Sequence, residues 1–270
     1  MGEGVAVTDR IDTSVAHPAR RYDYWLGGKD NFQADRDSGD QIAKLYPGIR
    51  TAAVENRRFL RRAVTYLTRE AGIRQFLDIG TGIPTADNTH EVAQRIAPDA
   101  RIVYVDNDPI VLAHARALLR SSKEGRTAYL DADLRDPDRI LADADLRDTL
   151  DLTRPVGLML IAVLHFVTDE EEPYAIVRRL LDALPPGSHL ALSHGTLDFI
   201  PPEVKAAAAA SGMRSDMYGR TRDEVARFLD GLEIVEPGIV AVPEWRGEEE
   251  PAPRPAPGEV SVYGAVARKP

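Results

Sequence analysis

Carboxylates and glycines stand in this sequence where together they could hold a small cationic ligand. An apolar run at residues 75–79 contains one acid, Asp78, and breaks into Gly80-Thr81-Gly82 before a helix-forming run begins. Glycines at such a break let the backbone turn sharply and bring its N–H groups against a ligand. The helix that follows presents its positive end to the same place. A carboxylate at the end of a buried strand needs a partner, and a ligand that carries an ammonium group would be one partner for Asp78.

Two further carboxylates and a histidine follow the next apolar runs. Asp106 ends the run 101–106, Asp133 follows 127–130, and His165 follows 156–163. In a parallel sheet the carboxyl ends of the strands meet at one edge, and ligands bind there. A carboxylate after the second strand can accept hydrogen bonds from both ribose hydroxyls, and one after the third from a purine amine. Singly, Asp106 could be a helix cap and Asp133 a turn residue, but their joint placement favours a nucleoside site.

The spacing of the glycines after the first strand indicates which class of nucleotide the site can bind. A dinucleotide-binding turn has the pattern Gly-x-Gly-x-x-Gly, whereas Thr85 stands where the third glycine would be. The Gly-Lys-Ser/Thr sequence of a phosphate-binding loop is also absent. We therefore predict a ligand with an adenosine and a cationic head but no pyrophosphate.

The elements that must position these residues alternate regularly through the middle of the chain. Strands are predicted at 75–79, 101–106, 127–130, 156–163 and 189–193, with helices at 86–96, 109–119 and 169–184 and helical pieces within 136–152. Such a βαβ series predicts a doubly wound, mostly parallel α/β sheet. Helices at 202–212 and 221–229 and strands at 232–235 and 260–267 complete a seven-stranded sheet. Helices at 35–45 and 51–71 precede the sheet as an N-terminal cap.

This pattern divides the chain into three parts. Residues 1–16 read as a flexible lead, 17–72 as a helical cap or lid, and 73–270 as the ligand-binding sheet domain with a Pro- and Glu-rich loop at 243–258. The stretch 17–32 is rich in aromatic residues, among them Tyr22 and Tyr24. It is either a helix that docks through its aromatic side chains or a lid with Tyr22 or Tyr24 as a wall of the ligand site.

Composition narrows the function further. The 270 residues carry a formal net charge of −9, which argues against nucleic acid as a partner because such binders need a basic face. Without cysteine, disulfides, thiolate catalysis and cysteine-ligated zinc are excluded, and we predict no metal site. No signal-like apolar segment opens the sequence, and no apolar run approaches the ~20 residues that span a membrane. We expect a cytoplasmic protein with no membrane partner, and its oligomeric state is not readable.

At these residues the sequence resembles a known family. The motif Asp78-Ile79-Gly80-Thr81-Gly82 followed by Asp106 is similar to class I S-adenosylmethionine-dependent methyltransferases. The segments RYDYWLGGKDNF (21–32), ENRRF (55–59) and VDNDP (105–109) more closely resemble an actinobacterial family of S-adenosyl methyltransferases of unknown substrate. The resemblance covers about residues 15–268 and implies a Rossmann-like methyltransferase sheet with S-adenosyl-L-methionine as the cofactor.

The resemblance also implies roles for individual residues. Asp78 to Gly82 would hold the methionine part of the cofactor, Asp106 the ribose and Asp133 the adenine amine, with Asn107 beside the adenine. The predicted cofactor-binding set is Tyr22, Tyr24, Asn31, Asp78, Gly80, Thr81, Gly82, Asp106, Asn107, Asp133, Leu134 and Ala162.

Three hypotheses follow for the function. The first is a methyltransferase acting on a small-molecule acceptor, for instance of secondary metabolism, with His165 either as a general base or as a hydrogen-bonded wall of the pocket. The second is a non-catalytic protein that binds S-adenosylmethionine or S-adenosylhomocysteine, because the sequence lacks a convincing acid–base pair. A third is a dinucleotide-dependent oxidoreductase, against which the glycine pattern speaks.

Overall fold

A single mixed sheet organises the computed structural model, which describes residues 12–118, 121–203, 205–206, 216–248 and 250–270. Seven strands follow one another in the order β3-β2-β1-β4-β5-β8-β6, and a short extra strand, β7, pairs with β8. The strands are β1 (Gln75–Ile79), β2 (Arg101–Asp106), β3 (Arg126–Asp131), β4 (Gly157–Ile161), β5 (His189–Gly195), β6 (Glu233–Ile234), β7 (Val240–Ala241) and β8 (Val262–Arg268).

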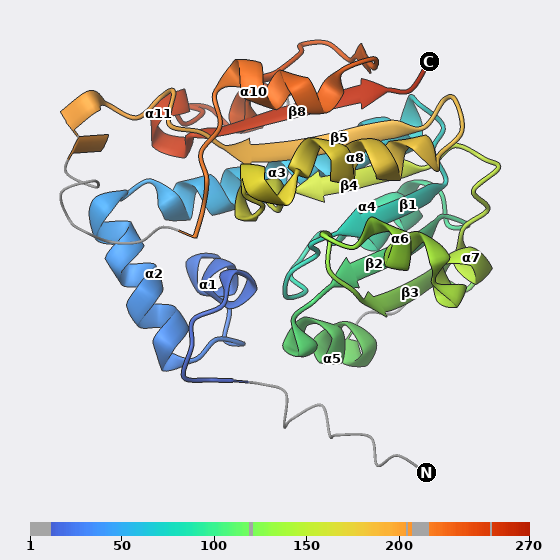
Figure 1. Ribbon diagram of the computed structural model, residues 1–270, viewed down its shortest axis with the longest axis horizontal. Coiled ribbons are helices and arrows are strands. Elements are labelled where there is room, and N and C mark those ends of the chain that lie inside the picture. The colour runs from blue at the N-terminus through green and yellow to red at the C-terminus, as the bar shows by residue number, and fades with distance from the viewer. Residues whose placement is uncertain (1–11, 119–120, 204, 207–215, 249) are drawn as a thin grey trace.

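The five strands from β3 to β5 are parallel, and β8 pairs antiparallel with β5, β6 and β7. The carboxyl ends of the parallel strands therefore share one edge, on the left in Figure 1. This arrangement confirms the predicted doubly wound, mostly parallel sheet. The two-residue strand β7 is the one addition, and it is too short to show an alternating pattern in sequence.

Helices cover both faces of the sheet (Figure 1). They are α1 (Pro18–Trp25), α2 (Gln33–Leu45), α3 (Ile49–Arg69), α4 (Thr89–Ile96), α5 (Pro109–Leu118), α6 (Pro137–Ala142), α7 (Ala144–Thr149), α8 (Pro173–Asp182), α10 (Arg222–Ala226) and α11 (Pro257–Val260), with 3-10 turns η2 (Leu164–Phe166), η3 (Asp169–Glu171), η4 (Arg227–Leu229) and η5 (Val242–Glu244). No helix in these described ranges combines the length and apolar character needed to cross a membrane.

Helix α3 is part of the layer that covers the sheet. Its buried side chains recur at helical spacing, as Phe59, Ala63 and Leu67 show, and they share one core with Phe76 of β1 and Met159 of β4. The predicted division at residue 72 therefore does not coincide with a break in packing. Of the three N-terminal helices, α1 and α2 lie beyond the carboxyl edge of the sheet, where Figure 1 shows them in blue.

Several predicted boundaries shift for local reasons. Strand β4 ends at Ile161 because Ala162 has a φ of +55°. The helix predicted over 169–184 is divided by Glu172, whose φ is +54°, and Pro173 opens α8. The Pro- and Glu-rich loop at 243–258 is anchored, because Trp245 is fully buried and meets Phe59 edge to face.

Four predicted segments fall partly outside the described residues. Residue 119 of the helix predicted at 109–119 and residue 249 of the loop predicted at 243–258 lie outside. Of the lead predicted at 1–16, residues 1–11 lie outside. Of the helix predicted at 202–212, residues 202–203 and 205–206 are described and are helical. The other residues of that range lie outside the described part of the chain.

The turn after β1 is where glycine is required. Gly80 has a φ of +75° and Gly82 a φ of +69°, a region that other residues occupy only with strain. A Cβ added to Gly80 would lie 2.4 Å from the Cγ2 of Val163, whereas one added to Gly82 would meet nothing within 4 Å. The two glycines therefore differ in their packing although they share a backbone conformation.

We expect Gly80→Ala to destabilise the fold more than Gly82→Ala. The Gly82 variant should lose about 1–2 kcal/mol through backbone strain, and the Gly80 variant a further ~1–3 kcal/mol through overpacking against Val163. Urea unfolding followed by circular dichroism measures both losses. Adding Val163→Ala should recover part of the loss in the Gly80 variant only, and equal losses in the two single variants would contradict this account.

Candidate cofactor-binding site

The carboxylate of Asp78 is buried at the end of β1, beside the glycine turn. Its Oδ2 accepts a hydrogen bond of 2.6 Å from the hydroxyl of Thr89, at the start of α4. Burial raises the pKa of Asp78 to about 6, against the lowering effect of the Thr89 hydrogen bond. A buried carboxylate with a raised pKa is stabilised by a cationic ligand, so this position suits an ammonium group.

Asp106 joins the glycine turn to the next strand end. Its Oδ2 accepts from the backbone N–H of Gly82 at 2.9 Å, and its Oδ1 from the N–H of Asp108 at 2.9 Å. Burial raises the pKa of Asp106, although both backbone hydrogen bonds oppose the shift. An ionised carboxylate offers about four lone-pair positions, so Asp106 retains acceptor capacity for two hydroxyl groups.

Asp133 and Asn107 meet after β3 and β2. The Nδ2 of Asn107 donates to the Oδ2 of Asp133 at 2.7 Å, and the backbone N–H of Arg135 donates to the Oδ1. Burial raises the pKa of Asp133, but these hydrogen bonds and the charge of Arg135 outweigh it and lower the pKa overall. Leu134 is buried in the core beneath the pair.

A chain of hydrogen bonds connects the cap to the ends of β4 and β5. The hydroxyl of Tyr22 accepts from the Nδ2 of Asn56 at 2.9 Å, and the Oδ1 of Asn56 accepts from the hydroxyl of Ser193 at 2.6 Å. The Ser193 hydroxyl in turn accepts from the N–H of Ala162 at 2.9 Å. Ala162 is thereby held in a left-handed conformation, which costs about 1–2 kcal/mol for a residue other than glycine.

His165 lies in the 3-10 turn η2, just after β4, and its side chain is buried and neutral. Burial lowers its pKa well below 6.5, helped by the charge of Arg220 and by His194. Its Nδ1 faces the backbone N–H of Gly195 at 3.3 Å and must accept, so the ring proton of the neutral form sits on Nε2. In this arrangement the Nε2 of His165 is a hydrogen-bond donor, and both predicted roles of His165, general base and wall of the pocket, stay predictions.

The second histidine of this edge is also neutral. Burial lowers the pKa of His194 to about 4, its Nε2 accepts from Arg220 at 2.9 Å, and its Nδ1 lies 2.7 Å from the carbonyl of Gly195. Arg220 also donates to the carbonyls of Leu164 and Val167. This cluster fixes the segment after β4, and both nitrogens of His194 are occupied.

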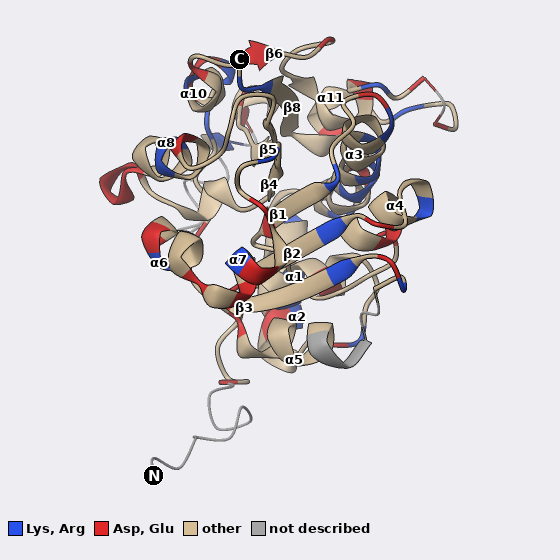
Figure 2. Cartoon of the chain, turned by 90° about the vertical axis from the view of Figure 1, so that its right-hand side faces the viewer, with Lys and Arg blue, Asp and Glu red and all other residues tan. Residues whose placement is uncertain are grey.

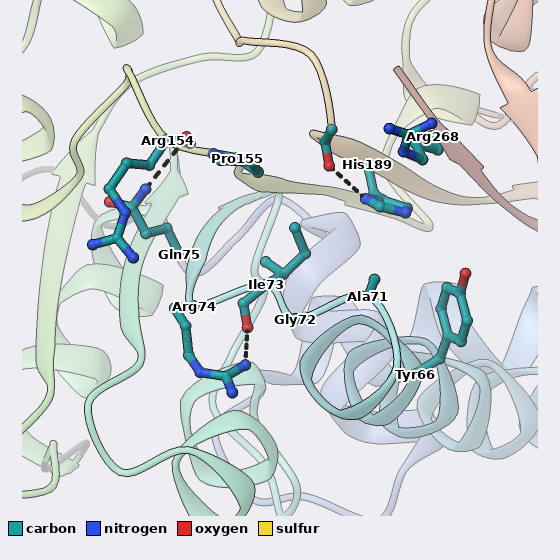
Figure 3. A pocket seen from close by; sticks show the side chains of 11 residues that line it. Tyr66, Ala71, Gly72, Ile73, Arg74, Gln75, Arg154, Pro155, His189 and Arg268 are labelled. Atoms are coloured by element: carbon teal, nitrogen blue, oxygen red, sulfur yellow. Dashed lines mark hydrogen bonds between the residues drawn. The ribbon is translucent and has the colours of Figure 1, made fainter. Parts of the chain in front are cut away.

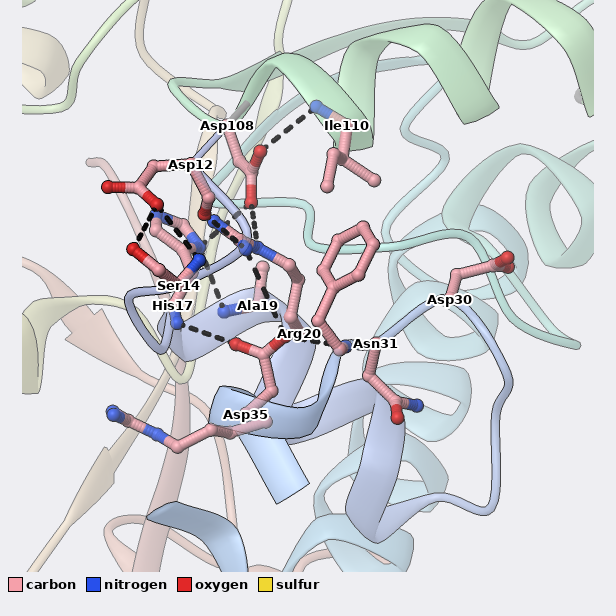
Figure 4. A network of polar contacts seen from close by, with 12 residues as sticks. Asp12, Ser14, His17, Ala19, Arg20, Asp30, Asn31, Asp35, Asp108 and Ile110 are labelled. Carbon is pink, nitrogen blue, oxygen red and sulfur yellow. Dashed lines mark hydrogen bonds and ion pairs between the residues drawn. The ribbon is translucent and has the colours of Figure 1, made fainter. Parts of the chain in front are cut away.

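The cap is fastened to the site through Asp108. Its Oδ2 pairs with the Nε of Arg20 at 3.2 Å and lies 3.0 Å from the Nδ1 of His17. Figure 4 shows Arg20 between Asp108 and Asp35, the latter at 3.9 Å. The Oδ1 of Asp108 caps α5 through the N–H of Ile110. One carboxylate therefore anchors both the start of α5 and the start of α1, next to Asp106.

Two residues of the predicted set make their side-chain contacts within the cap. Tyr24 is two positions after Tyr22 on α1, so the two side chains leave on nearly opposite sides of the helix. The Tyr24 hydroxyl donates to Asp40 at 2.8 Å, and its ring lies under Arg50. The amide of Asn31 bonds the carboxylate of Asp23 and the carbonyl of Gly28. Both residues contribute to the packing of the cap, and their roles in cofactor binding stay predictions.

The structure adds three residues that the sequence analysis did not select. Asn56 and Ser193 are 137 positions apart, and no local pattern signals their contact. Asp108 caps α5, and its contacts with Arg20 and His17 depend on tertiary packing. Nowhere in the described ranges do three or more histidine or carboxylate side chains gather as a metal site requires.

Comparisons with known proteins agree with this geometry. A DUF574 family protein from Streptomyces avermitilis has 53% sequence identity and a TM-score of 0.90, covering 96% of this chain and 99% of its own. A Thermobifida fusca protein has 42% identity and a TM-score of 0.87, covering 98% and 99%. An O-methyltransferase family protein from Burkholderia thailandensis, at 14% identity and a TM-score of 0.54 over 92% of this chain and 63% of its own, shares the fold alone.

None of the proteins with curated functions matches the sequence. The family model described as S-adenosyl methyltransferase, however, matches residues 5–270. That match spans nearly the whole chain and confirms the resemblance carried by the glycine turn and the N-terminal block. The chain therefore belongs to the S-adenosyl methyltransferase family.

Proposed function

We propose that this protein transfers the methyl group of S-adenosylmethionine to a small-molecule acceptor at the carboxyl edge of the sheet. The observation that carries the proposal is the alignment of Asp78, the glycine turn and Asp106 at consecutive strand ends, in a chain of this family. A cytoplasmic location and the absence of a nucleic-acid partner remain predictions from composition.

The residues at this edge fit the chemistry of the cofactor. Asp78 would pair with the ammonium group of the methionine part, and the turn at Gly80 and Gly82 would leave room for the backbone to approach it. Asp106 would accept from the ribose hydroxyls, with Asp133 and Asn107 beside the adenine. When bound, the cofactor supplies a methyl group made electrophilic by its sulfonium.

The residues on the acceptor side serve positioning and exclusion of water. Tyr22 belongs to α1, which lies across the carboxyl edge (Figure 1), and Asn56 and Ser193 fix its hydroxyl in place. Holding reactants in a productive geometry can itself supply much of the reduction in the barrier. The net charge of −9 supports a small acceptor over a nucleic acid.

The neutral histidines favour one alternative. Neither His165 nor His194 is arranged as a proton acceptor toward a substrate, so the protein could bind the cofactor without catalysing transfer. That reading remains the second candidate. The dinucleotide-dependent oxidoreductase has no support, because the family match is to methyltransferases over residues 5–270.

We expect Asp106→Asn to weaken S-adenosylhomocysteine binding at least tenfold, because the amide loses a charge-assisted acceptor and offers donors to the ribose. Isothermal titration calorimetry measures the dissociation constant. Asp138→Asn is the matched control, since this carboxylate is 70% exposed and pairs with Arg179. An unchanged constant in the Asp106 variant would place the ribose elsewhere, and absence of binding to the unmodified protein would refute the proposal.

Binding of the same ligand should weaken as the pH falls below about 6. Asp78, with a pKa of about 6 in the free protein, must be ionised to pair with an ammonium, so binding expels a proton in acid. The affinity should drop up to tenfold per pH unit and stay level above pH 7.

Calorimetry at pH 5 and 7.5 in buffers of different ionisation enthalpy reads both the affinity and the released proton. Asp78→Asn should flatten the profile, leaving only the contribution of Asp106, whose pKa is also raised. An affinity that is equal at the two pH values in the unmodified protein would exclude Asp78 as the ammonium partner.

Methyl transfer from labelled S-adenosylmethionine to a panel of phenols, amines and carboxylic acids tests catalysis. With an active acceptor, His165→Gln should lower kcat less than tenfold, since loss of a general base costs about 10²- to 10⁴-fold. A hundredfold loss would restore His165 as the base. Saturable cofactor binding without transfer to any acceptor would favour the non-catalytic candidate.

A further inference from the structure

A cavity of about 350 Å³ lies at the amino edge of the sheet, opposite the candidate cofactor site. It is formed by the end of α3, the segments before β1 and β4, the start of β5 and the end of β8 (Figure 3). Its volume is in the range of small-molecule sites, about 300–1,000 Å³. The residues that line it, all of them described, include no acid, although the whole chain carries a net charge of −9.

Three arginines line this cavity: Arg74, Arg154 and Arg268. Guanidinium groups present N–H donors in a planar fork that matches the oxygens of a phosphate or a carboxylate. Tyr66 and His189 also line it, with their rings 6.3 Å apart, edge to face. The cavity thus combines cationic donors with a wall of ring atoms.

Most arginines at this edge are explained by the fold. Figure 2 faces the edge and shows basic residues at the starts of the parallel strands. Arg101 and Arg126 donate to the carbonyls of Thr149 and Asp148, at the end of α7. Such contacts satisfy the carbonyls left free at a helix terminus.

Arg74 has a comparable structural role. Its Nη1 donates to the carbonyls of Thr68 and Ile73 at 2.8 and 3.0 Å, which closes the end of α3. Its Nε lies 4.0 Å from Asp99, outside the lining of this cavity. Arg74 therefore contributes charge to the cavity while it stabilises the turn into β1.

Arg154 has no such role. Its guanidinium forms neither a hydrogen bond nor an ion pair with any residue that the structure describes, and its hydrogen bonds are made by its backbone: the N–H donates to the carbonyl of Asp151, and the carbonyl accepts from Gln75. The charge of Arg154 interacts with Asp151, which lines a neighbouring pocket with Arg154 and does not line this cavity. Arg268 pairs with Glu233 at 2.8 Å. The free donors of Arg154 thus adjoin a cavity with two further guanidinium groups.

We propose that this cavity is an oxyanion site, which binds a phosphate or carboxylate group of a small molecule through Arg154, Arg74 and Arg268. The ring edges of Tyr66 and His189 would contact the remainder of that molecule. The proposal does not depend on methyl transfer, because none of these residues belongs to the carboxyl edge.

The test titrates phosphate, pyrophosphate and malonate separately into the full-length protein at constant ionic strength, with calorimetric detection. At least one probe should bind saturably, and Arg154→Gln should weaken that binding at least tenfold. The substitution leaves the backbone carbonyl that Gln75 uses in place. Arg179→Gln, which removes the same charge from a half-exposed pair with Asp138, should bind as the unmodified protein does.

The relative affinities identify the ligand class. Preference for phosphate or pyrophosphate assigns a phosphorylated ligand, and preference for malonate a carboxylated one. Asp106→Asn should leave anion binding unchanged, and Arg154→Gln should leave S-adenosylhomocysteine binding unchanged, so the two sites are separable. Absence of saturable binding for all three probes, or equal binding by the Arg154 variant, would overturn the proposal.

Discussion

The carboxylate of Asp106 is the interaction on which the candidate site depends. It accepts from the backbone of the glycine turn on one side and from Asp108 on the other, so one side chain sets the relative positions of two strand ends. Asp108 then extends the arrangement to the cap through Arg20 and His17. Asp106 and Asp108 together thus fix the positions of the strand end, the glycine turn, the start of α5 and the cap relative to one another.

Holding carboxylates in this way has a thermodynamic cost. Burial raises the pKa of both Asp78 and Asp106, which means that the folded protein binds protons more tightly there than the unfolded chain does. The stability that Asp78 contributes therefore declines as the pH rises from about 4 to 6, and the contribution of Asp106 changes in the same direction. The left-handed Ala162 adds backbone strain at the same edge. Such local costs are typical of functional sites, because a ligand can offset them.

Most strands and helices of the fold could be predicted from the sequence, because they depend on local patterns of apolar and polar residues. The apolar runs predicted the individual strands and helices. The acids at the ends of the strands predicted that the ligand site lies at the carboxyl edge of the sheet. The contact between Asn56 and Ser193 could not be predicted, since it depends on how α3 crosses β5. Helical periodicity places Tyr24 on the side of α1 opposite Tyr22, so the two tyrosines predicted for the site do not share one face of the helix. The burial of Trp245 was not predicted, because the Pro- and Glu-rich residues around it are typical of an exposed loop.

Helix α3 carries a mechanical consequence of the way it is packed. It has 21 residues, so it is about 30 Å long and reaches from one edge of the sheet to the other. Asn56, near one end, holds the tyrosine of the cap, while Tyr66, near the other, lines the arginine cavity. Since the apolar face of α3 is locked into the core between them, the helix acts as a rigid rod. An axial slide or a rotation of α3 would be transmitted to both edges at once, without any hinge between domains.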